Sequence, residues 1–154
     1  MARSNLGALL KQMGDLNAAE KILREAVHAM RKALGDTHTA TISSVTNLGL
    51  VLERQGDVAS AEALLREAAQ ASENIVGPSH PQTAACLTHL GSLLENRGDL
   101  EAALGVHSQV LTALEATERQ EGTRSVASHV AALLQRVGRG AQADALLTKH
   151  RVYG

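Results

Sequence analysis

Aromatic side chains are nearly absent from this chain of 154 residues, which has no Trp, no Phe and a single Tyr, Tyr153. Any hydrophobic core must therefore consist of Leu, Val, Ile and Ala side chains, for which a hydrophobic content of 44% is sufficient. Cysteine is equally scarce, since Cys86 stands alone. A single cysteine excludes an internal disulfide and favours a reducing compartment.

The chain also lacks an excess of charge and a long apolar run. It carries 15 basic and 16 acidic residues, for a formal net charge of −1. Such a balance creates no field that would attract nucleic acid or an anionic membrane. No stretch approaches the roughly 20 apolar residues of a membrane span, and the N-terminal segment lacks the apolar centre of a signal peptide. We therefore expect a cytoplasmic protein with no nucleic-acid partner and no membrane partner.

What the chain does contain is an internal repeat. Gly14, Gly56 and Gly98 are spaced by 42 residues, and Gly138 follows after a shorter step of 40. A fixed period in this range is typical of stacked helical units, in which the core lies between neighbouring units. We expect a single array over residues 1–154. Its units cover about 1–34 (incomplete), 35–76, 77–118 and 119–154.

The array is expected to be a fragment of a longer repeat protein. Its first helix lacks an opening turn, and nothing follows Gly154 to cover the last helix. Arrays of this kind normally carry polar capping elements.

Apolar residues recur in steps of three and four throughout, and no segment alternates in twos, so an all-α fold is predicted. Gly14 and its counterparts should end helices in the left-handed conformation, whereas Gly35, Gly77 and Gly122 should mark the turns between units. Pro81 suits the first position of a helix. The eight expected helices cover residues 2–13, 16–34, 38–55, 58–75, 80–97, 100–118, 122–137 and 140–151.

Three further glycines lie inside helical patterns, at Gly7, Gly49 and Gly91. Glycine destabilises a helix by roughly 1 kcal/mol relative to alanine, so glycines that recur every 42 residues imply one common structural reason. The close approach of a neighbouring helix is the reason we expect. Gly105 fits no such class and should soften its helix.

Each unit resembles the tetratricopeptide repeat, a helix-turn-helix with a Leu-Gly pair in its first helix and a small residue in its second. In the second unit these residues are Leu48-Gly49 and Ala61. The spacing and the phrases GDTHTAT (35–41) and GPSHPQT (77–83) are similar to the kinesin light chain subclass. The resemblance implies a right-handed α-α superhelix of about four units that acts as a protein-interaction scaffold or adaptor.

In such repeats the first helices line the concave face, which suits an extended or helical peptide. The resemblance further implies that the residue before the leucine hydrogen-bonds the peptide backbone. Two arginines on the stripe suggest a mild preference for acidic segments. The candidate groove residues are Asn5, Gln12, Asn47, Leu50, Arg54, His89, Ser92, Asn96, His129 and Arg136.

The seven histidines do not predict a metal site. His38 with His80, and His89 with His129, occupy equal positions in different units, which at helix-packing distances of about 10 Å cannot share one ion. His107 stands at a core position where other units have leucine. We therefore expect neither a bound metal nor a cofactor.

Nothing in the sequence indicates catalysis. Cys86 has no base fixed near it and is expected to be a small buried hydrophobe. Acidic residues such as Glu20 and Glu62 stand four residues before arginines, which is typical of surface ion pairs. We expect no enzyme. The alternative to a peptide groove is a structural role, in which open ends stack on further repeats or on another copy of the chain.

Overall fold

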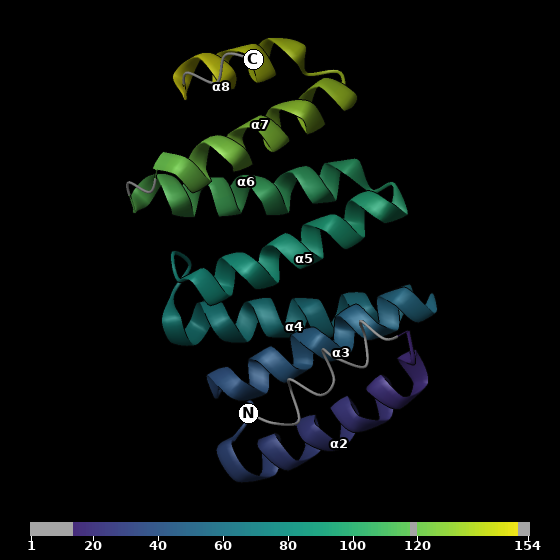
Figure 1. Cartoon of the computed structure of the whole chain (residues 1–154). Helices are drawn as coiled ribbons and strands as arrows, with labels where there is room; N and C mark the ends of the chain where they lie inside the picture. Colours follow the sequence, from purple (N-terminus) through teal and green to yellow (C-terminus); the bar gives the residue numbers. More distant parts are fainter. Residues whose placement is uncertain (1–13, 118–119, 151–154) are drawn as a thin grey trace. The chain divides into compact units, whose positions relative to one another are not determined.

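The computed structural model describes residues 14–117 and 120–150, and within these ranges the chain consists of helices joined by short turns, with no strand (Figure 1). The helices are α2 (Leu16–Leu34), α3 (Thr39–Gln55), α4 (Val58–Val76), α5 (Pro81–Arg97), α6 (Leu100–Ala116), α7 (Gln120–Arg136) and α8 (Gly140–Lys149).

The predicted all-α class is confirmed for the described residues. Every bound of these seven helices lies within two residues of its expected position. The eighth expected helix, at 2–13, lies outside the described residues. One turn assignment was wrong: Gly122 lies in the first turn of α7, which begins at Gln120, and does not mark a turn before the helix.

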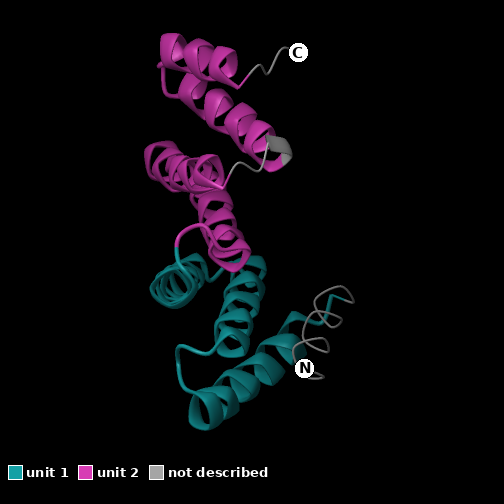
Figure 2. Cartoon of the chain, turned by 90° about the vertical axis from the view of Figure 1, so that its left-hand side faces the viewer, with its two compact units in different colours: residues 1–77 teal, residues 78–154 magenta. Residues whose placement is uncertain are grey.

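The chain divides into two compact units, Met1–Gly77 and Pro78–Gly154 (Figure 2). In the first unit α3 packs against both α2 and α4. In the second unit each helix packs against its neighbour in sequence, α5 on α6, α6 on α7 and α7 on α8. Local hairpins of this kind are the building blocks of a helical repeat.

Aspartate begins the second helix of three successive repeats. The side chains of Asp15, Asp57 and Asp99 each accept a hydrogen bond from the backbone N–H three residues later, at 3.0, 3.2 and 3.2 Å. An N-cap of this type satisfies a donor that the helix itself leaves open. In the last repeat Arg139 stands at this place, and α8 has no side-chain cap.

The phrases between units acquire a local structural role. The Nδ1 atoms of His38 and His80 accept the backbone N–H groups of Ala40 and Gln82, at 3.2 and 3.1 Å, and so cap α3 and α5. Pro81 is the first residue of α5, as predicted.

A threonine in the same phrase joins the helix to the preceding turn. The hydroxyl of Thr41 donates to the carbonyl of Gly35 at 2.8 Å, and Thr83 and Thr123 are buried at the equivalent places. The histidine and the threonine of this phrase therefore fix where α3 and α5 begin.

Glycine ends the helices as expected. Gly56 and Gly98 adopt left-handed conformations with φ of 88° and 85°, and their N–H groups donate to carbonyls of the preceding turn. Glycine adopts this conformation without a steric penalty, so the chain can reverse within two residues.

The core is built around one small residue in each second helix. Ala19, Ala61, Ala103 and Ala143 are all 0% exposed. The absence of a larger side chain lets the two helices of a hairpin approach closely, and branched aliphatic residues such as Leu65 and Leu94 fill the remaining space. Cys86 is buried among these residues, as predicted.

Within the described ranges, no helix is both long enough and apolar enough to cross a membrane.

The difference between core and rim can be tested on α3. Leu48 is 3% exposed, whereas Leu50, two residues on, is only partly buried. We expect Leu48→Ala to lower the free energy of unfolding by about 2–5 kcal/mol, because it leaves a cavity in the core. Leu50→Ala, the matched control, should cost much less. Urea unfolding of both variants measures the difference, and equal losses would contradict this assignment of the core.

Candidate functional site

In the first unit the predicted groove residues follow one side of α3. Asn47 and Leu50 are partly buried, and Arg54 is exposed one turn further on. Residues three, four and seven apart share one face of a helix, so these three form a line along α3. Asn5 and Gln12 lie outside the described residues. The peptide-binding role of this line stays a prediction.

In the second unit the same spacing recurs on α5 and α7. His89 is partly buried, while Ser92 and Asn96 on α5 and His129 and Arg136 on α7 are exposed. The structure connects two of these residues, His129 and Arg136, through a side chain outside the predicted set.

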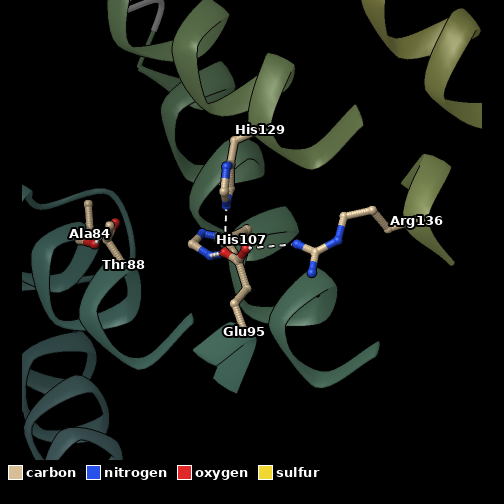
Figure 3. A network of polar contacts seen from close by, with 6 residues as sticks. All are labelled: Ala84, Thr88, Glu95, His107, His129 and Arg136. Atoms are coloured by element: carbon tan, nitrogen blue, oxygen red, sulfur yellow. Dashed lines mark hydrogen bonds and ion pairs between the residues drawn. The ribbon is translucent and has the colours of Figure 1, made fainter. Parts of the chain in front are cut away.

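That connecting side chain is Glu95 on α5, whose carboxylate is the centre of a polar network from three helices (Figure 3). Its Oε1 atom lies 2.9 Å from Nε2 of His107 on α6 and 2.6 Å from Nε2 of His129 on α7. Its Oε2 atom lies 3.5 Å from Nη1 of Arg136. An ionised carboxylate only accepts hydrogen bonds, so both contacts with Oε1 require a proton on the histidine Nε2.

His107 enters this network from the hydrophobic core. It is 4% exposed and occupies the place that Leu23 and Leu65 fill in the preceding repeats, where both leucines are 0% exposed. The predicted core position of His107 is therefore confirmed. Its ring packs edge-on against that of His129, with centroids 4.6 Å apart.

The ring of His107 lies directly over Gly91 on α5. A Cβ atom at Gly91 would stand 2.5 Å from Nε2 of His107, and a Cβ at Gly49 would stand 3.1 Å from Cγ of Leu65 in the preceding repeat. The predicted reason for these glycines, the close approach of a second helix, is confirmed. The absence of a side chain at Gly91 is what allows an imidazole to lie between α5 and α6.

The network shifts the protonation equilibria of two of its members. Burial alone would raise the pKa of Glu95, but the hydrogen bond and charge of His129, together with those of His107, hold that pKa below the ordinary 4.5. Burial, and then the charge of His129, lower the pKa of His107 below the ordinary 6.5, against the opposing effect of Glu95. Near neutral pH the centre therefore holds an ionised carboxylate and a neutral His107.

Sequence reasoning missed this network for an identifiable reason. Equal repeat positions pair His89 with His129, whereas the structure brings His129 to His107, which belongs to a second helix and a different repeat position. Two substitutions in the sequence could have indicated the network. His107 replaces a core leucine in the third repeat, and His129 replaces asparagine in the first helix of the fourth. In the described part of the chain, the ligand atoms of Glu95, His107 and His129 form a group within 4.8 Å of one another.

A second feature of this unit is an open groove between α6 and α8, with a volume of about 560 Å³. Gly105 lies on its wall, and a Cβ there would meet nothing within 4 Å. Apolar side chains of α7, Val130 and Leu134, also line it.

Ion pairs between α6 and the α8 segment cross this groove. Arg139 pairs with Glu101 at 3.2 Å, and Lys149 pairs with Glu115 at 2.8 Å. The hydrogen bond from Lys149 is the main cause that lowers the pKa of Glu115, with smaller help from Lys149's charge and from His150, and it outweighs the raising effect of burial. The groove is thus bordered by pairs of opposite charge.

These features define an all-helical repeat protein, in which side chains of one repeat bind those of the next. The sequence matches the tetratricopeptide repeat family over residues 1–73 and again over residues 41–116. The chain belongs to the tetratricopeptide repeat family. No curated protein matches its sequence.

Solved structures of kinesin-light-chain type share the fold at low sequence identity. The nearly identical TPR-like repeats attributed to a kinesin light chain of Podosopora anserina are 22% identical, with a TM-score of 0.83 over 97% of this chain and 72% of that one. BtubC (BKLC) from P. vanneervenii is 16% identical, with a TM-score of 0.85 over 97% of this chain and 60% of that one. The predicted resemblance to the kinesin light chain subclass is confirmed at the level of the fold.

A more distant structure extends the comparison. MamA AMB-1 is 18% identical, with a TM-score of 0.64 over 99% of this chain and 76% of that one. Sequence identities at this level show a shared fold and do not indicate a shared binding partner.

The Glu115 ion pairs make the docking of α8 dependent on pH. Because its folded-state pKa lies below 4.5, Glu115 contributes stability that is complete above that value and is lost as the pH falls through the lowered folded pKa. Glu115→Gln should therefore destabilise the protein by about 0.5 kcal/mol at pH 7, the range of a partly exposed ion pair. Thermal unfolding from pH 7 to pH 3 should show the difference from wild type shrink as the pH falls below 4.5.

The matched control is Glu25→Gln, which removes an exposed carboxylate of α2. It should show no such pH-dependent difference. A Glu115→Gln effect that stays constant across this range would contradict an electrostatic role.

Proposed function

We propose that this chain is a non-enzymatic scaffold that binds a segment of a partner protein along the first helices of its repeats. The observation that carries the proposal is that Asn47 on α3 and His89 on α5 have equivalent surroundings. Both side chains stand at the same repeat position, both are partly buried, and each precedes a leucine that is 3% exposed. A polar group held at the edge of the core is preorganised to bind a peptide backbone.

The chemistry of these side chains suits an extended main chain. An amide both donates and accepts, and a neutral imidazole does likewise, so either can bind a peptide bond through its N–H or its C=O. Arrangement of the repeats in a right-handed superhelix would present one such group per repeat to a single bound segment. Affinity should be micromolar, or about −8 kcal/mol.

The preference for acidic segments is a weaker part of the proposal. It draws on Arg54 and Arg136, and Arg136 already lies 3.5 Å from Glu95. The charge that Arg136 offers to a partner is therefore reduced.

The structural alternative requires bare apolar surfaces that could stack on further repeats. Among the described residues the exposed large hydrophobic side chains are Leu34 and Ile75, which are 49% and 43% exposed. Both stand near the C-terminal ends of second helices, and neither lies on α8. On α8, therefore, the described residues offer no exposed large hydrophobic side chain for stacking.

Peptides selected from a random library on the full chain provide the direct test. We expect Asn47→Ala combined with His89→Ala to weaken binding of the selected peptides by about 10-fold, or 1.4 kcal/mol, with the melting temperature nearly unchanged. The control is Arg66→Ala on α4, which removes only an exposed pair with Glu62 and should bind normally. Parallel loss of binding and stability would assign the two residues to the fold.

Light scattering over a concentration series distinguishes the alternative. The groove proposal predicts a concentration-independent mass near 16.2 kDa. A mass that rises with concentration would show self-association and would favour a structural role.

A further inference from the structure

The Glu95 network brings together three donor atoms of the kinds that transition metals bind. Two imidazole nitrogens and one carboxylate oxygen converge from three different helices, α6, α7 and α5, and lie within 4.8 Å of one another. Figure 3 shows the two histidine rings and the carboxylate turned toward a common point. Nitrogen and oxygen donors of this type bind Zn²⁺ at about 2.0–2.2 Å.

The sequence departs from its own repeat most clearly at His107, while His129 differs from the second repeat and matches His89 of the third. His107 stands where the earlier repeats bury Leu23 and Leu65, and His129 stands where the second repeat has Asn47. A polar ring at a core position loses favourable burial unless it gains a partner. The ring of His107 lies over Gly91, and its Nε2 atom is directed at Glu95.

We propose that Glu95, His107 and His129 form a binding site for a divalent transition-metal ion of the Zn²⁺ type. Two histidines and one carboxylate supply three ligands, which leaves a fourth position for water. His129 is 46% exposed on its side chain, so the ion has a path from solvent and the fourth position faces outward. The site would join the third repeat to the fourth, because α5 and α6 belong to one and α7 to the other.

Only a small rearrangement is needed for the ion to enter. Donor atoms around a tetrahedral ion stand about 3.3 Å apart when the bonds are near 2.0 Å. The Nε2 atoms of His107 and His129 lie 2.9 and 2.6 Å from Oε1 of Glu95, so each nitrogen must move less than 1 Å away from that oxygen. The ligand atoms of the two rings lie within 4.8 Å of each other and must also come to about 3.3 Å. Metal binding requires each Nε2 atom to lose its proton. A neutral ring then carries its proton on Nδ1, a positively charged ring releases one proton to solvent, and the ion takes the place of the two hydrogen bonds.

The charges at the site act in two directions. The carboxylate of Glu95 supplies a negative charge that attracts a cation. The guanidinium of Arg136 lies 3.5 Å from Oε2 of Glu95 and would repel a cation. Its side chain is 54% exposed and can turn toward solvent, but its charge should weaken the site.

The experiment uses the full chain, prepared without a histidine tag and treated with a chelator. Titration calorimetry with Zn²⁺ should show one equivalent bound with micromolar or tighter affinity. Co²⁺ should give the visible bands of a four-coordinate complex. With Zn²⁺ at about 100 times its Kd, the melting temperature should rise by about 5 °C.

Variants drawn from the repeat itself identify the ligands. His107→Leu and His129→Asn restore the residues of the second repeat, so both should fold, and circular dichroism checks this. Each should weaken Zn²⁺ binding by roughly 100-fold and abolish the Co²⁺ bands, and Glu95→Gln should do the same. The control is His89→Asn, a partly buried histidine at the repeat position of His129, which should leave binding unchanged.

Arg136→Asn should strengthen Zn²⁺ binding, in contrast to the ligand variants. It removes the nearby positive charge and places at this position the residue that α5 has at Asn96. Zn²⁺ should bind several-fold more tightly. No uptake by the wild type, or uptake that survives both His107→Leu and His129→Asn, would overturn the proposal and leave the cluster as a hydrogen-bond network. The peptide-binding proposal is tested separately through Asn47→Ala with His89→Ala, neither of which changes a proposed metal ligand, so the failure of one proposal can be distinguished from the failure of the other.

Discussion

The close approach of two helices within each hairpin is the constraint on which the rest of the structure depends. It requires a small residue at one place in every second helix, and Ala19, Ala61, Ala103 and Ala143 are fully buried there. In α3 and α5 it also favours glycine in the first helix, where a leucine or histidine of the second helix packs onto the backbone, whereas α7 has Ala131 at this position. A chain almost without aromatic residues can satisfy these requirements, because short side chains fill the narrow space between closely spaced helices.

Periodicity made most of this fold predictable. Glycines and aspartates at fixed intervals placed the turns, since Gly56 can adopt a left-handed conformation and Asp57 can cap the helix that follows. Gly122 was misassigned because glycine in the first turn of a helix resembles glycine before it. The histidines of the linking phrases were recognised as repeated, but their capping role depends on a side-chain rotamer that the spacing does not encode.

The Glu95 network was not predictable by the same means. Aligning the repeats relates each residue only to those at the same repeat position, whereas Glu95, His107 and His129 stand at three different positions. Their meeting depends on the direction of each side chain and on the space above Gly91. The deviations from the repeat, rather than the repeat itself, carried the information about this cluster.

The last helix differs from its predecessors in how its beginning is fixed. α2, α4 and α6 start with an aspartate that caps the helix locally, whereas α8 starts at Arg139, which has no capping hydrogen bond and pairs with Glu101 on α6. Hydrogen bonds within a cap are short-ranged, but an exposed ion pair is screened by salt over a Debye length of about 8–10 Å at physiological ionic strength. Added salt should therefore weaken the contact that fixes the start of α8 more than the caps that fix the starts of α2, α4 and α6.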